Sequence, residues 1–133
     1  MLPRLLRMHH SKDFRRTTKR GIRVSRPTLV VHAMHVPSDV ASEEDGLERH
    51  RPRVGFVVSG ALGNAVTRNR VKRRLRHLAA AHVAETPVGM DIVVRALPRA
   101  ATEPEVVPTD LGSAWYEAVS RLASRRPDQD GGA

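Results

Sequence analysis

The chain has 133 residues, which is the size of one ordinary domain. It carries 23 Lys and Arg against 14 Asp and Glu, a formal charge of +9, so its partners are expected to be polyanions. It contains no cysteine, which excludes disulfides, thiolate metal sites and thiol nucleophiles and fits a reducing compartment.

The first ten residues, MLPRLLRMHH, lack the apolar core of a signal peptide, and no later run approaches the roughly 18 apolar residues of a membrane span. We therefore expect a cytoplasmic protein. An anionic membrane is the weaker candidate partner, because only 3% of the residues are aromatic and membrane-surface helices need bulky apolar side chains. Nucleic acid is the favoured polyanion.

The first predicted element is a short basic helix, SKDFRRTTKR, over residues 11–20. Ser11 is suited to the N-cap of this helix, and Gly21 is suited to end it. Phe14 is its only large apolar side chain, so it could anchor the helix, form the wall of a binding cleft, or do both.

Two runs rich in β-branched residues follow, TLVVHAMHV over 28–36 and RVGFVVS over 53–59, and both are predicted strands. The segment 37–52 between them collects five acidic residues and has the composition of a loop. We therefore expect a hairpin with a long, exposed connection. Phe56 alternates with valines and is expected in the core.

The next segment, GNAVTRNRVKRRLRHL over residues 63–78, combines heavy positive charge with an apolar stripe. At about 100° per residue, one side of a helix gathers an apolar row: Thr67, Val71, Leu75, Leu78 and His82. Arg70, Arg73 and Arg76 point away from that stripe, while Arg68 and Lys72 flank one margin beside Asn69. A packed helix with two basic surfaces is predicted.

The last two elements are a strand and a helix. MDIVVRAL, from Met90, is a short apolar run bounded by glycine and proline, which indicates a strand. Thr109 or Asp110 is suited to cap a helix that continues to Leu122, with Trp115 on its packing side. The order of elements points to one α+β domain over residues 1–126.

The tail, residues 127–133, offers no core residues and is expected to be disordered.

Charge on the helix of residues 63–78 is too uniform for an ordinary solvated face. No acidic residue lies between Glu48 and Glu85, and like charges four residues apart repel each other. The counter-charge is therefore expected from a partner, and arginine favours phosphate because its planar fork can bind two oxygens. Gly63 and Asn64 could begin the helix and offer backbone amides to a phosphate.

The stretch VGFVVSGALGNAVTRNRVKRRLRHL resembles the marker of the bacterial ribonuclease P protein component, with its RNR triplet at Arg68, Asn69 and Arg70. SKDFRRTTKRG upstream and DIVVRALP downstream extend the resemblance over roughly residues 9–126. The opening MLP followed by arginines is similar to actinobacterial members.

The resemblance implies a fold and a function. The fold is a mainly antiparallel four-stranded sheet with three helices, in the order helix, three strands, helix, strand, helix, and a left-handed crossover around the RNR helix. The function is that of the protein subunit of ribonuclease P, which binds a catalytic RNA and the 5′ leader of precursor tRNA. Mg²⁺ held mainly by the RNA activates water, the protein supplies no catalytic residue and holds no metal, and the protein itself is expected to be monomeric.

The resemblance also assigns residues. Those expected to contact the catalytic RNA are Arg70, Arg73, Arg74 and Arg76. Those expected to contact the leader are Phe14, His32, Arg68, Asn69 and Lys72, with Gly63 and Asn64 at the helix entrance.

This chain departs from the family pattern at three places. Thr18 stands where many members have a second aromatic residue, and His32 stands where a tyrosine is common. Gly60 and Ala61 replace a usual lysine pair before GNAV. Because base stacking is worth ~1 to 3 kcal/mol per base, the leader is expected to be held more by charge here.

Two other functions remain open from the residues alone. A ribosomal or general RNA-binding protein would share the basic helix, whereas a stand-alone nuclease would need carboxylates or paired histidines near it. His32 and His35 face opposite sides of a strand, and His77 and His82 diverge on a helix, so neither pair is expected to share a metal.

Overall fold

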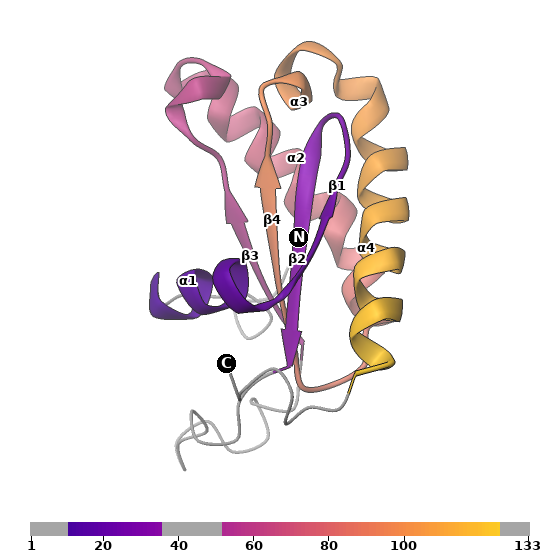
Figure 1. The fold of residues 1–133 in the computed structure, drawn as a ribbon. Coiled ribbons are helices and arrows are strands. Elements are labelled where there is room, and N and C mark those ends of the chain that lie inside the picture. The colour runs from indigo at the N-terminus through magenta and orange to yellow at the C-terminus, as the bar shows by residue number, and fades with distance from the viewer. Residues whose placement is uncertain (1–10, 36–51, 126–133) are drawn as a thin grey trace.

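The computed structural model describes residues 11–35 and 52–125. They form an α+β fold, as expected (Figure 1). The helices and strands follow one another as α1 (Ser11–Arg20), β1 (Ile22–Ser25), β2 (Leu29–His35), β3 (Arg53–Val57), α2 (Ala65–Ala84), β4 (Met90–Ala96), α3 (Arg99–Thr102) and α4 (Val107–Ala123). One 3-10 turn, Gly60–Leu62, precedes α2, and another, Pro104–Val106, precedes α4.

The strands form one mixed sheet in the order β1-β2-β4-β3. β2 is antiparallel to both β1 and β4, whereas β3 and β4 are parallel and are joined through α2. In Figure 1 both parallel strands point upward, β4 lies to the right of β3, and α2 passes behind the sheet. The crossover is therefore left-handed, as the resemblance implied and against the general preference.

The predicted hairpin between 28–36 and 53–59 is wrong, because β4 lies between β2 and β3. The hairpin partner of β2 is β1, whose four residues alternate between buried and exposed. β2 and β4 are buried along almost their whole length, which is typical of the central strands of a sheet. The long apolar run of β2 therefore indicated a central strand of the sheet.

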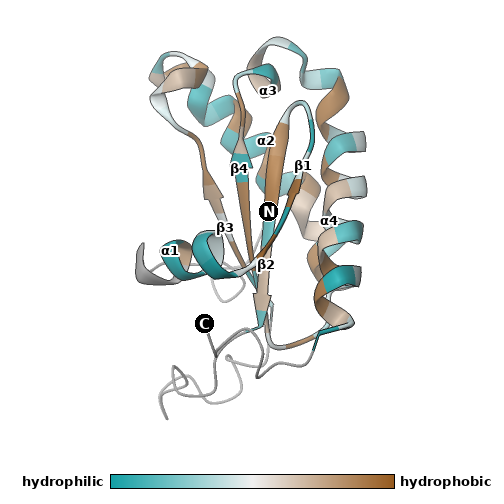
Figure 2. Ribbon diagram, viewed as in Figure 1, coloured by the Kyte–Doolittle hydropathy of each residue, from teal (hydrophilic) through white to brown (hydrophobic). Residues whose placement is uncertain are grey.

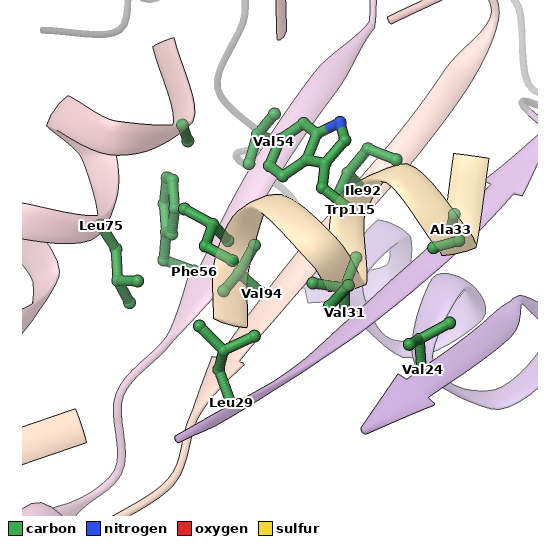
Figure 3. Packing of buried hydrophobic residues seen from close by; sticks show 14 of the residues in the cluster. Val24, Leu29, Val31, Ala33, Val54, Phe56, Leu75, Ile92, Val94 and Trp115 are labelled. Atoms are coloured by element: carbon green, nitrogen blue, oxygen red, sulfur yellow. The ribbon is translucent and has the colours of Figure 1, made fainter. Parts of the chain in front are cut away.

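The main core lies between one face of the sheet and the helices α2 and α4. Alternate residues of all four strands point into it, and Figure 3 shows Phe56 of β3 beside Leu75 of α2, with Trp115 of α4 over the sheet. Phe56 and Trp115 are buried, as predicted. Figure 2 shows the same division as brown central strands between helices that carry teal on their outer sides.

The apolar stripe of α2 is confirmed in part. Val71 and Leu75 are buried, but the row continues through Ala79 and Val83 while Thr67, Leu78 and His82 are only half-buried. Steps of four residues turn a helix roughly 40° further each time, so this row winds around α2. The winding suits a helix that packs first on β3 and then on α4.

The last helix begins at Val107, earlier than the predicted cap at Thr109 or Asp110. Pro108 lies in its first turn, where a proline costs no helical hydrogen bond. Asp110 is buried and accepts hydrogen bonds from the N–H of Thr28 (3.1 Å) and from its hydroxyl (2.7 Å). Its carboxylate therefore ties α4 to the residue that precedes β2.

The expected three helices become four, because the one-turn helix α3 follows β4. The acidic segment 37–52, apart from Pro52, and the tail 127–133 lie outside the described residues. The assignment of residues 1–126 to one domain stays a prediction.

Candidate nucleic-acid interface

Helix α2 presents a basic surface that the rest of the described chain does not neutralise. Its six cationic side chains are Arg68, Arg70, Lys72, Arg73, Arg74 and Arg76. None of them has an acidic partner among the described residues, whose ion pairs involve other arginines (Arg26, Arg53, Arg99 and Arg121). The buried row fixes this helix to the sheet, so the charge sits on a rigid support.

The entrance of α2 is built as the sequence suggested. Gly63 has φ 136°, in the left-handed region that favours glycine, and Asn64 caps the helix by accepting a hydrogen bond from the N–H of Thr67 (2.9 Å). Gly63, Asn64 and Val66 are exposed. A phosphate contact at this entrance stays a prediction.

An open hollow of about 300 Å³ lies along one side of α2. It is lined by Asn69, Lys72, Arg73, Arg76 and His77, a row three or four residues apart on one helix face. The hollow brings together residues that the sequence divided between two surfaces, since Asn69 and Lys72 were expected to meet the leader and Arg73 and Arg76 the catalytic RNA. Arg70 and Arg74 are exposed and lie outside it.

Phe14 lies on the face of the sheet opposite α2 and α4. Its ring packs directly over Gly55 of β3, where even a Cβ atom would overlap it. The ring is half-buried, so Phe14 both anchors α1 on the sheet and leaves part of its surface open. Both roles that the sequence left open for Phe14 are therefore compatible with its position.

His32 lies in the same lateral row of the sheet as Gly55. The register pairs Arg23 with His32, His32 with Val93, and Val93 with Gly55, so these four residues share one face across the four strands. α1 crosses the lower part of this face in Figure 1, and no other described helix covers the upper part. The row marks the border between the covered and the open half of the sheet.

The side chain of His32 is only 6% exposed, and its Nδ1 atom is buried without a hydrogen-bond partner among the described residues. Burial, together with the positive charges of Arg95 and Arg23, lowers the pKa of His32 from 6.5 to about 4. The imidazole is therefore neutral at physiological pH and lies beside two exposed cations.

Arg23 and Arg95 were not singled out from the sequence. Both are exposed on the open face of the sheet, and neither has an ion-pair partner within the described residues. The sequence did contain a signal for both, since each is the basic residue of a short strand and is flanked by apolar neighbours, in IRVS and MDIVVRA. Their convergence on His32 was hidden because it depends on the strand order.

The described residues contain no group of three or more His, Asp or Glu side chains placed to hold a metal ion. The acidic side chains near this surface are already engaged, because Asp91 accepts two hydrogen bonds from Arg53, each of 3.0 Å. In the same part of the chain, no helix has the length and apolar character that crossing a bilayer requires.

Comparison with known proteins gives a consistent result. The family model for ribonuclease P matches residues 2–119. A ribonuclease P protein component from Kocuria rhizophila is 48% identical over 124 residues, which cover 92% of this chain and all of that protein. The corresponding protein from a Nocardioides species is 52% identical over 101 residues, 76% of this chain and 80% of that one.

Solved structures agree with the sequence relatives. A mutant of the Staphylococcus aureus RNase P protein, described as defective in mRNA degradation, superposes with a TM-score of 0.69 at 28% identity and covers 85% of this chain and 87% of its own. The RNase P protein from Thermotoga maritima superposes with a TM-score of 0.65 at 25% identity, over 84% of this chain and 96% of that one.

Proposed function

This chain belongs to the ribonuclease P protein family, and on that premise we propose that it acts as the protein subunit of a ribonucleoprotein endonuclease that removes the 5′ leader of precursor tRNA. The observation that carries the proposal is the uncompensated basic surface of α2, held rigidly by the buried row of Val71, Leu75, Ala79 and Val83. Its counter-charge comes from RNA.

The catalytic RNA is bound by the outward arginines of α2. These are Arg70, Arg73, Arg74 and Arg76, of which three are exposed and Arg76 is half-buried. Because α2 is rigid, it holds its guanidinium groups at fixed distances from one another. This spacing favours a folded RNA, whose phosphates are also fixed, over a flexible single strand. Two of the four line the hollow on α2, and the other two extend the contact around the helix.

The leader of the precursor is bound at the edge of the sheet. Phe14 offers a partly open ring for base stacking, and His32 offers a neutral polar group in the same row of the face. Arg68, Asn69 and Lys72 come from α2, which packs against β3 at the edge of the sheet. Since β3 also lies under Phe14, a single strand of RNA can pass from the helix to the face.

Magnesium belongs to the RNA in this scheme. The described residues fit no metal ion of their own, and α2 offers a cation only repulsion. The metal supplies an activated water for phosphodiester hydrolysis when it is bound by the RNA. The side chains of this chain position the RNA partners and neutralise phosphate charge around them. We place the complex in the cytoplasm and expect the chain itself to be monomeric.

Reconstitution tests the proposal directly. The full chain is mixed with the cognate catalytic RNA and a precursor tRNA at low magnesium concentration, and cleavage at the mature 5′ end is followed. We expect cleavage to be much faster with the chain than without it. RNA binding without any stimulation would instead support a general RNA-binding protein, and cleavage by the chain alone would support a stand-alone nuclease.

A further inference from the structure

The open half of the sheet face carries two arginines whose charge nothing in the described chain explains. Arg23 on β1 lies directly opposite His32 on β2, where neighbouring Cβ atoms are roughly 5 Å apart. Arg95 on β4 lies opposite Val30 and is therefore a diagonal neighbour of His32, at roughly 7 to 8 Å. The two arginines thus approach His32 from strands on either side of β2.

The histidine between them is unusual for a strand position with an open side. It is almost fully buried, and its Nδ1 atom is closed to solvent without a hydrogen-bond partner in the part of the chain that the structure describes, so the charge on this face comes from the two arginines. The apolar neighbours on its own strand, Val30 and Met34, offer no hydrogen bond. Asp91, which the described strands place on this face, is bound to Arg53.

We propose that Arg23, His32 and Arg95 form a binding site for one phosphodiester group of the 5′ leader, in which the two guanidinium groups clasp the phosphate above the neutral, buried ring of His32. The site rests on the proposed function, and it extends the leader path from Phe14 across the open half of the sheet. Arginine suits it because a planar fork can bind two phosphate oxygens at once.

The three residues contribute in different ways. The arginines supply charge, so their share of the affinity falls as salt rises, by about 0.7 in the slope of log affinity against log salt for one phosphate of a single strand. The neutral imidazole supplies shape without charge, so its share does not depend on salt. This difference separates a phosphate site from a surface that is merely positive.

The test uses the complete complex of the full chain with the catalytic RNA under non-cleaving conditions. The affinity for precursor tRNA with a leader of several nucleotides is compared with the affinity for the same tRNA without a leader. The double variant R23Q/R95Q is expected to weaken binding of the leader-bearing substrate roughly tenfold, as for a lost charge-assisted contact, and to leave the leaderless substrate unchanged. H32F is expected to weaken binding with no change of salt slope.

A matched control carries the same loss of charge at another place. Arg99 and Arg121 are exposed and pair with Glu103 and Glu117, so R99Q/R121Q removes two positive charges away from the proposed site. Its affinity is expected to stay within about twofold of the wild type, since exposed pairs contribute little. An equal loss in both double variants would reduce the effect to net charge and overturn the proposal.

Neutral methylphosphonate linkages then locate the phosphate. Each linkage of the leader is neutralised in turn, and one position is expected to cost affinity in the wild type but not in R23Q/R95Q. Identical profiles for the two proteins would overturn the site. If the wild-type complex shows no preference for a leader at all, the proposed function itself fails, whereas a preference untouched by R23Q/R95Q refutes this inference alone.

Discussion

His32 shows how burial sets the charge of one side chain on the outer face of the sheet. The resemblance implies a tyrosine at this position, whose hydroxyl could donate a hydrogen bond and whose ring could stack. The imidazole is smaller and buried, and its burial together with the charges of Arg95 and Arg23 lowers its pKa and keeps it uncharged. A neutral group there leaves the charge of the site to Arg23 and Arg95.

The same burial makes His32 a source of acid sensitivity. Because the pKa of His32 is about 4 in the folded chain and 6.5 when unperturbed, the unfolded chain alone binds the proton between these values. The free energy of unfolding should therefore fall as the pH falls through this window, by about 2 kcal/mol from this residue at pH 5, and should be unaffected above pH 7.

Urea unfolding of the wild type and of His32→Phe at pH 7 and pH 5 measures this effect. The variant should lose less stability between the two pH values than the wild type, with the other histidines common to both. Equal losses in the two proteins would show that His32 is protonated as easily in the folded state as in the unfolded one.

Gly55 is the residue that permits Phe14 to lie on the sheet. A Cβ at this position would overlap the ring, so Gly55→Ala should destabilise the chain by about 1 to 3 kcal/mol as the ring is displaced. Gly60→Ala is the matched control, because nothing lies within 4 Å of the added atom. The two unfolding free energies from urea titration should differ clearly, and equal values would contradict the packing of Phe14.

At the scale of elements, α2 could be predicted well from the sequence and the sheet could not. Apolar spacing and the cap at Asn64 are local signals, so the helix, its start and its outward arginines follow from neighbours in the chain. The position of β4 between β2 and β3 depends on contacts between distant segments. For that reason the predicted hairpin failed and the cluster around His32 was missed.

The basic surface of α2 gives a prediction for each outward arginine. If Arg70, Arg73 and Arg76 each contact a phosphate of the catalytic RNA, replacing one by glutamine should flatten the slope of log affinity against log salt by roughly 0.7 to 0.9. Binding of the purified chain to the RNA at several salt concentrations measures this slope. An unchanged slope would show that the side chain is only solvated.

Helix α4 depends on a contact that the sequence concealed. Asp110 has the residue type of a helix cap, yet its carboxylate is buried against Thr28. Asp110→Ser shortens the side chain and leaves the N–H and hydroxyl of Thr28 without their carboxylate acceptor, so it should cost about 1 to 3 kcal/mol.

A double-mutant cycle with Thr28→Ala checks this contact by urea unfolding. The two substitutions should be clearly non-additive, because both remove the hydrogen bond from the Thr28 hydroxyl to Asp110. Additive losses would contradict that contact.

At the scale of the whole molecule, the sheet separates two tasks. Its inner face builds the core with α2 and α4, while its outer face carries α1, Phe14 and the row of Arg23 and His32. The six cationic side chains of α2 lie on a surface that the fold holds rigid, since α2 is fixed by its buried row. In the proposed function, α2 binds the folded RNA and the outer face binds the single strand, and the two surfaces meet at the edge strand β3.

The affinity difference between precursor and mature tRNA tests this account most directly. It is measured with the catalytic RNA alone and with the reconstituted complex under the same salt and magnesium conditions. The account predicts that adding this chain strengthens binding of the precursor much more than binding of the mature tRNA, because the chain contacts the leader. An equal gain for both tRNAs, or no gain for either, would contradict it.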